Sequence, residues 1–80
     1  DIIQNAINRL PEQYRAVFVL RDVDGMSNQE VGEILGLSIP AVKSRLHRSR
    51  LMLRKKLQRH YTEYVLGNVS SQNFSDVAAA

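Results

Sequence analysis

Four side chains in the second half of the chain can form hydrogen bonds with a ligand from one face of a helix. They stand at positions i, i+1, i+4 and i+5 and are Lys43, Ser44, His47 and Arg48. An α-helix brings this spacing to one side. Lysine and arginine donate to O6 and N7 of guanine, and serine and histidine adapt to other base edges. The pattern therefore predicts a helix that reads the major groove of duplex DNA.

Two further arginines, Arg45 and Arg50, flank this face and are placed for contact with backbone phosphates. Eight of the 11 lysine and arginine residues lie between residues 43 and 59, where no Asp or Glu occurs, although the formal net charge of the chain is only +3. One helix thus carries the positive field expected of a protein that binds a polyanion. The simpler alternative is a solvated charged face without a ligand.

The segment ahead of the basic helix has the start and stop signals of a first, shorter helix. Ser27 and Glu30 have the spacing of a capping box, and Gly36 tolerates the left-handed conformation that ends a helix. The apolar residues between them are expected on one buried face: Val31, Ile34 and Leu35. Gly32 is costly inside a helix, so we expect the second helix to approach closely there.

The second helix is expected to begin directly after the turn, because Ser38 is a good N-cap and Pro40 fits a first helical turn. Its buried stripe is predicted to comprise Ile39, Val42, Leu46, Leu53 and Leu57, with Ser49 between them. The helix-turn-helix would then span about 27–48 and its second helix about 39–60. Such a short connection favours a steep crossing of the two helices.

Two more helical patterns precede the motif, one from about residue 2 to Leu10 and one from Pro11 to the Asp24-Gly25 turn. They supply the bulky core residues Tyr14, Phe18, Leu20 and Val23. The sequence thus predicts an all-α, four-helix domain over residues 1–61 with a C-terminal helix-turn-helix, followed by a flexible extension over 62–80. Residues 62–66 of this extension could prolong the last helix, and the flexible tail is expected beyond Gly67. Within that extension, Phe74 and Val77 leave open a short docking segment.

Composition disfavours several other classes. The 80 residues contain no cysteine, and neither His47 nor His60 has a carboxylate at ligand or triad spacing, so we expect no metal, no cofactor and no enzyme activity. No apolar run approaches the roughly 20 residues that span a bilayer. We therefore expect a cytoplasmic protein without a small-molecule ligand.

The run from Leu10 to Leu57 resembles region 4, the C-terminal DNA-binding domain of bacterial sigma factors of the extracytoplasmic-function (ECF) group. The resemblance rests on an ordered set of short motifs. These are Leu10-Pro11, Asp24-Gly25-Met26-Ser27, Glu30-Val31, Leu35-Gly36, and Val42-Lys43-Ser44-Arg45-Leu46 followed by Arg48. The resemblance implies the fold of sigma region 4, a helix-turn-helix domain related to the winged-helix type.

The resemblance implies partners and roles. The domain would dock on the flap of the RNA polymerase β subunit and place its last helix in the major groove of the upstream (−35) promoter element. The residues facing the groove would be Lys43, Ser44, His47 and Arg48. Those near phosphate would be Ser27, Ser38, Pro40 and Arg45. An anti-sigma factor often holds such a domain inactive, with Leu51 and Met52 as candidate contacts.

Two alternatives remain open at this stage. One is the output domain of a response-regulator-type activator, although the strongly basic last helix disfavours self-association. The other is an interaction module whose basic helix binds an acidic protein or an anionic membrane surface, although a membrane-binding helix would need a broader apolar face of bulky residues. In the sigma-factor case the chain is expected to be a fragment that does not start transcription alone, because the domain that melts promoter DNA is absent.

Overall fold

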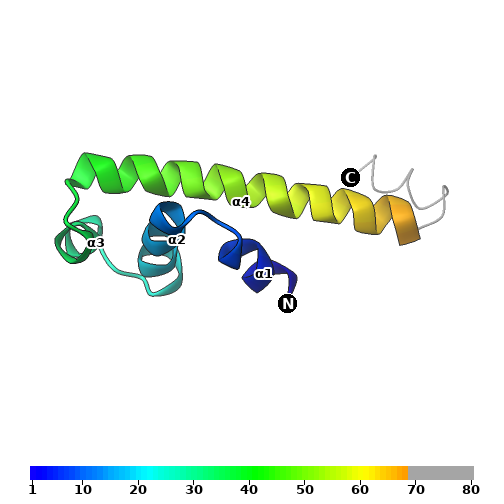
Figure 1. Cartoon of the computed structure of the whole chain (residues 1–80), viewed down its shortest axis with the longest axis horizontal. Helices are drawn as coiled ribbons and strands as arrows, with labels where there is room; N and C mark the ends of the chain where they lie inside the picture. The colour runs from blue at the N-terminus through cyan, green and yellow to red at the C-terminus, as the bar shows by residue number, and fades with distance from the viewer. Residues whose placement is uncertain (69–80) are drawn as a thin grey trace.

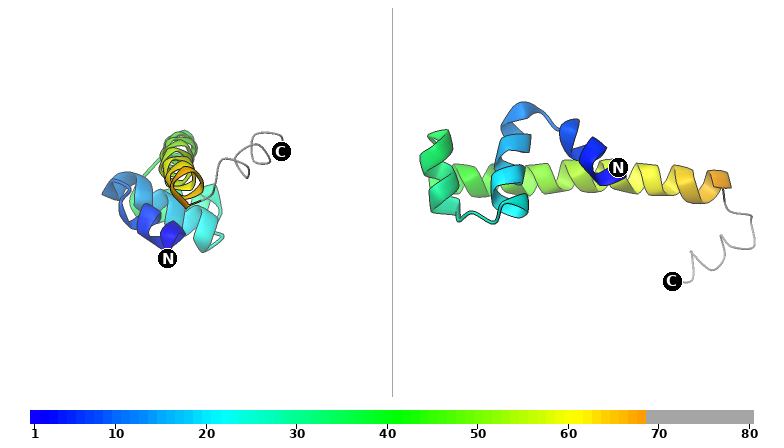
Figure 2. Two further views of the ribbon diagram at one scale, coloured as in Figure 1. Left: turned by 90° about the vertical axis from the view of Figure 1, so that its right-hand side faces the viewer. Right: turned by 90° about the horizontal axis from the view of Figure 1, so that it is seen from below.

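One long helix carries three short ones along a single side. The computed structural model describes the backbone of residues 1–68 and the side chains of residues 1–62. The helices in this part are α1 (Ile2–Asn8), α2 (Glu12–Phe18), α3 (Asn28–Leu35) and α4 (Ile39–Asn68), and a π-helical segment, η1 (Val19–Val23), continues α2. The three short helices leave the opposite side of α4 uncovered (Figures 1 and 2). The predicted all-α, four-helix fold is confirmed.

The predicted capping residues form the caps of the helix-turn-helix. The Ser27 hydroxyl accepts from the Glu30 backbone N–H, and the Glu30 carboxylate accepts from the Ser27 N–H, both at 3.0 Å. Gly36 ends α3 with a φ of 70°, and the Ser38 hydroxyl accepts from the Ala41 N–H at 3.2 Å. Local hydrogen bonds therefore fix both ends of the turn between α3 and α4.

The short helices bury two apolar clusters against α4. The first joins α2, α3 and the beginning of α4 and contains Val17, Val31, Val42 and Leu46. The second joins α1 to the middle of α4 and contains Ala6, Ile7 and Leu53, with Phe18 and Leu57 packed against it. Because the two clusters follow each other along α4, they hold the same side of that helix inward over most of its described side chains.

Three apolar residues that were expected in the core are exposed, so those predictions are wrong. The exposed fractions are 57% for Ile34, 42% for Ile39 and 60% for Val23. Only a narrow stripe of the short α3 meets α4, and Ile34 lies about 100° from its centre on the helical wheel. Ile39 stands at the tip of α4. Val23 ends η1, where i→i+5 pairing shifts side chains away from the 3.6-residue period.

The last helix continues past the predicted domain boundary at residue 61. It runs to Asn68, two residues beyond the stretch 62–66 that was expected as its possible continuation. No proline interrupts residues 58–68, and a single glycine in a helix costs only about 1 kcal/mol. The flexible tail expected beyond this point and the possible docking residues Phe74 and Val77 lie outside the described residues.

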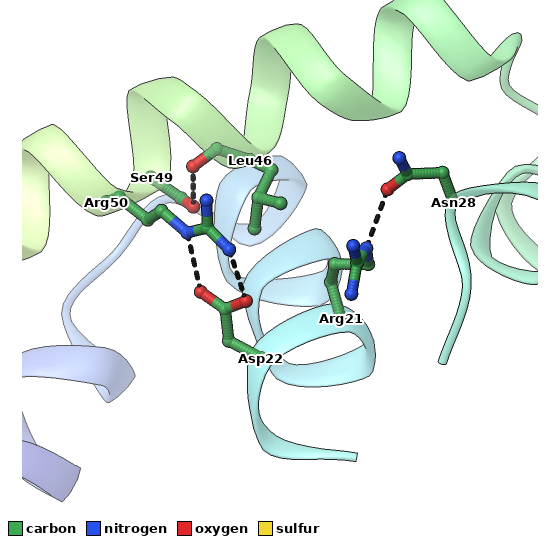
Figure 3. A network of polar contacts seen from close by, with 6 residues as sticks. All are labelled: Arg21, Asp22, Asn28, Leu46, Ser49 and Arg50. Carbon is green, nitrogen blue, oxygen red and sulfur yellow. Dashed lines mark hydrogen bonds and ion pairs between the residues drawn. The ribbon is translucent and has the colours of Figure 1, made fainter. Parts of the chain in front are cut away.

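The η1 segment ties α2 to both helices of the helix-turn-helix (Figure 3). The Arg21 Nε–H donates to Asn28 Oδ1 at 2.6 Å, at the start of α3. The next residue, Asp22, accepts two hydrogen bonds from the Arg50 guanidinium of α4, at 2.7 and 2.8 Å. This paired arrangement holds the pKa of Asp22 below its ordinary value, chiefly through the hydrogen bonds from Arg50. Two adjacent side chains thus orient α3 and α4 relative to α2.

Gly32 permits the tight turn after α3. A Cβ atom at this position would stand 2.5 Å from the Leu37 carbonyl oxygen and 3.7 Å from Val42 Cγ2. The closest backbone is therefore that of the turn and not, as expected, that of the second helix. The Gly32 carbonyl also accepts from the Leu37 N–H at 2.8 Å, so this part of the turn cannot move away freely.

Gly32→Ala should therefore destabilise the domain, although alanine is the better helix former. The backbone shift that relieves the contact costs about 1–3 kcal/mol, and the gain in helix propensity offsets about 1 kcal/mol of this. A net loss of about 1 kcal/mol in the free energy of unfolding is expected by urea titration followed by circular dichroism. Glu33→Ala, at an exposed position of the same helix, is the control. Equal or higher stability of Gly32→Ala would contradict this account.

Asp22→Asn tests the pair with Arg50. Because the folded-state pKa of Asp22 is lowered, the charged pair stabilises the fold above the unfolded-state pKa of about 3.9, and this contribution is lost as the pH falls through the folded-state value. Arg50 is half-exposed, so we expect the variant to be less stable by only about 0.5–1 kcal/mol at pH 7. The difference should shrink as the pH falls below the unfolded-state value and through the lowered folded-state pKa of Asp22. Unfolding titrations across this range should show no such gap for Asp24→Asn, and a gap for Asp22→Asn that is independent of pH would argue against the ion pair.

Candidate nucleic-acid interface

The four predicted base-reading residues lie together on the uncovered side of α4. Lys43, Ser44, His47 and Arg48 are all exposed, whereas Val42, Leu46 and Ser49 between them are buried. The helix begins only four residues before Lys43, so this face stands near a free helix end (Figure 1). A helix end of this kind can enter a groove without a clash from the rest of the domain.

Arg48 has a neighbour that the sequence pattern did not indicate. The guanidinium of Arg48 lies beside the phenol of Tyr14 on α2 and, together with Gln13, lowers the pKa of Tyr14. Arg45 acts on the same phenol through its charge. Tyr14, expected only as core bulk, is half-buried at the edge of the reading face. Arg48 itself remains exposed beside this phenol.

The two arginines expected at phosphates have different surroundings. Arg45 is partly buried on the flank of α4 that faces Tyr14. Arg50, by contrast, gives its fork of donors to Asp22, and this contact raises the pKa of Arg50. A phosphate would have to compete with a carboxylate for Arg50. No local sequence signal marks this pair, because 28 residues separate its members.

The other residues expected near phosphate lie at helix starts. Ser38 and Pro40 are exposed at the beginning of α4, close to the reading face. Ser27 lies at the opposite end of the eight-residue α3, about 12 Å from the turn at 1.5 Å per residue. Its backbone N–H is engaged by Glu30, whose carboxylate would repel a phosphate. The structure thus brings Ser38 and Pro40 to the face, and gives Ser27 a capping role.

The two residues predicted to contact a protein partner differ in exposure. Leu51 is 42% exposed and follows Ser44 by seven residues, which is two helical turns, so it shares the uncovered face. Met52 is half-buried on the flank. A protein bound over Leu51 would therefore cover part of the face that carries Lys43, Ser44, His47 and Arg48.

A shallow groove runs between α1 and the distal half of α4. It is lined by the apolar residues Ile2, Ala6 and Leu57 and by the polar and basic residues Asn5, Arg9, Lys56, Arg59 and His60. Within residues 1–62, no cluster of three His, Asp or Glu side chains is placed to hold a metal ion. None of the described helices has the length and apolar character needed to cross a membrane.

The family match and the similar proteins all indicate the same family. Residues 1–53 match the family described as Sigma-70, region 4. The ECF RNA polymerase sigma factor SigE of Mycolicibacterium smegmatis is 43% identical over 61 residues, which cover 76% of this chain and 24% of that protein. SigW of Bacillus subtilis, also an ECF RNA polymerase sigma factor, is 48% identical over 58 residues, covering 72% and 31%. The ECF RNA polymerase sigma-E factor of Haemophilus influenzae is 33% identical over 57 residues, covering 71% and 30%.

The chain spans about a quarter to a third of the length of these curated relatives. No solved structure matches it. The family match covers α1, α2, α3 and α4 as far as Leu53, which includes every residue of the reading face. A capped helix-turn-helix, an exposed basic face on its second helix and a match over most of the chain agree with one another, and the chain belongs to the Sigma-70 region 4 family.

Proposed function

We propose that this chain is the promoter-recognition domain of an ECF-type sigma factor and binds the −35 element through the beginning of α4. Lys43, Ser44, His47 and Arg48 contact base edges in the major groove, and Ser38, Pro40 and Arg45 contact phosphates. The observation that carries the proposal is the joint exposure of the four base-reading residues on the uncovered side of a helix whose other side is packed. Family membership favours this role over that of a response-regulator output domain.

As part of a sigma factor, the domain would direct RNA polymerase to promoters, and the cytoplasm of a bacterium follows as its location. A sigma factor is an initiation factor and not an enzyme. The contact with the flap of the polymerase β subunit must leave the uncovered face of α4 free for DNA. The groove between α1 and α4 meets this condition, because the short helices lie on the other side of α4 (Figure 2).

An anti-sigma factor is proposed as the regulator, with Leu51 at its contact. The argument is steric, because Leu51 lies on the reading face two turns beyond Ser44. A protein that buries Leu51 would exclude duplex DNA without having to unfold the domain. Met52, being half-buried on the flank, would contribute only at the edge of such an interface.

The base-reading assignment is tested by separating specific from general binding. Duplexes bound by the chain are first selected from a random pool, and affinities for a selected and a scrambled duplex are then measured by fluorescence anisotropy. Lys43→Ala and Arg48→Ala should lose about 1–3 kcal/mol of discrimination per base contact. Arg45→Ala should weaken both duplexes alike and reduce the slope of log K against log salt concentration by about one.

Arg9→Ala is the matched control, since it removes one positive charge at the C-cap of α1 and leaves the uncovered face of α4 unchanged. Its affinities for both duplexes should stay close to those of the unmodified chain. If Lys43→Ala and Arg48→Ala weaken the selected and scrambled duplexes by the same factor, these residues do not read bases. If no duplex is enriched by the selection, sequence-specific binding by this domain is refuted.

A further inference from the structure

The uncovered face of α4 repeats its polar pattern beyond the proposed reading residues. Eleven residues after Lys43–Ser44 stands Arg54–Lys55, and eleven residues after His47–Arg48 stands Gln58–Arg59. Eleven residues make about three turns of a helix with 3.6 residues per turn. The second set therefore has nearly the same direction as the first and lies about 16 Å further along the helix axis, at 1.5 Å per residue.

The packing of α4 keeps both sets in register. The buried positions repeat with the same spacing, because Val42 and Leu46 are followed after eleven residues by Leu53 and Leu57. The first two pack in the cluster with α2 and α3, and the second two in the cluster with α1. As α4 is unbroken from Ile39 to Asn68 (Figure 1), two separate packing contacts hold one face of it outward.

The second set is exposed and carries charge that the described part of the protein does not neutralise. Arg54, Lys55 and Gln58 are all exposed. Among the described residues, neither Arg54 nor Lys55 forms an ion pair, whereas Arg50 on the flank is paired with Asp22. The cations of α4 that face away from the bundle are thus unpaired at both levels of the repeat.

The dimensions of DNA define what the second set meets. The major groove is about 12 Å wide. The second set of polar residues lies about 16 Å further along the same helix than residues 43–48. When residues 43–48 lie in the major groove, the second set is therefore outside the groove, level with the sugar-phosphate backbone at its edge. Base edges are out of reach there, and phosphate oxygens are the available partners for lysine and arginine.

We propose that Arg54 and Lys55 form a second phosphate-binding pair, which contacts the backbone at the edge of the groove that the beginning of α4 reads. The inference rests on the proposed function and extends the DNA-binding surface from about two turns of α4 to about three and a half, at 3.6 residues per turn. Continuity with the reading face and charge complementarity favour duplex DNA as the ligand of this pair. Because phosphates carry no sequence information, the pair raises affinity and does not change specificity.

Arg54→Ala/Lys55→Ala tests the proposal in the complete 80-residue chain. Its affinity for a selected and a scrambled 24-base-pair duplex is measured over a series of salt concentrations. The matched control is Arg9→Ala/Lys56→Ala, which removes the same number of charges from residues that line the groove between α1 and α4 and do not belong to the second set. Circular dichroism melting of both double variants establishes that they are folded, as expected for substitutions of exposed or half-buried charged residues.

The variant should weaken both duplexes by the same factor at low salt and reduce the slope of log K against log salt concentration by about two. The control should leave the slope unchanged. A second measurement uses duplexes with neutral methylphosphonates at the groove edge. These should weaken binding of the unmodified chain but not of Arg54→Ala/Lys55→Ala.

Three results would overturn the inference. A normal slope for Arg54→Ala/Lys55→Ala, in the presence of a clear loss for Lys43→Ala, would reject the second pair and leave the proposed function intact. Equal effects of the two double variants would show that only net charge matters. If the unmodified chain binds no duplex, the proposed function is rejected together with the second pair. This outcome differs from the first one, because Lys43→Ala then causes no measurable loss of binding.

Discussion

The contact between α2 and α4 around Ser49 determines how the reading face is presented. Ser49 is completely buried, and its hydroxyl donates to the Leu46 carbonyl at 2.7 Å, so its polar group is satisfied inside its own helix (Figure 3). The residues on either side reach α2 and η1: Arg48 lies beside Tyr14, and Arg50 is paired with Asp22. A small side chain lets the two helices approach, because a larger one would force them apart in a close-packed interior. The rotation of α4 about its axis is thereby fixed, and with it the outward direction of the residues opposite Ser49.

The helix α2 crosses α4 steeply, and this limits how much of the α4 surface it covers (Figure 2). Parallel helices would cover a broad strip of one another, whereas α2 crosses α4 and contacts only a short length of it (Figure 2). The clusters built with α3 and α1 add contacts before and after this point, all on the same side. A domain of modest size can thus hold a long helix by one side while the opposite side stays exposed over residues 39–62. This arrangement suits a ligand as large as a DNA duplex better than it suits a small molecule.

Features set by neighbouring residues could be predicted from the sequence, and features set by contacts between distant segments could not. The Ser27–Glu30 capping box, the left-handed Gly36 and the exposed reading face depend only on residues within one or two helical turns, and all were predicted. The Asp22–Arg50 pair joins residues 28 positions apart, and helical periodicity contains no information about it. The exposure of Val23 depends on the π-helical pairing of η1, which a regular 3.6-residue pattern does not reveal. Family resemblance supplied the role of the domain, because a basic helix face alone is also compatible with other anionic partners.

Three arginines of α4, Arg48, Arg50 and Arg54, differ in how the rest of the domain restrains them. These differences separate general electrostatic attraction to DNA from the positioning of side chains that contact bases. An unrestrained arginine loses up to about 2 kcal/mol of side-chain conformational entropy when it is fixed on a ligand. Arg48 is exposed beside the phenol of Tyr14 and so keeps most of this freedom until it binds a ligand. Asp22 restricts Arg50 through two hydrogen bonds, but it also cancels a positive charge next to the exposed face of α4 and so lowers the attraction to any polyanion. If Arg54 and Lys55 restore that attraction at the groove edge, affinity and sequence reading are supplied by different parts of one rigid helix, and each can change without disturbing the other.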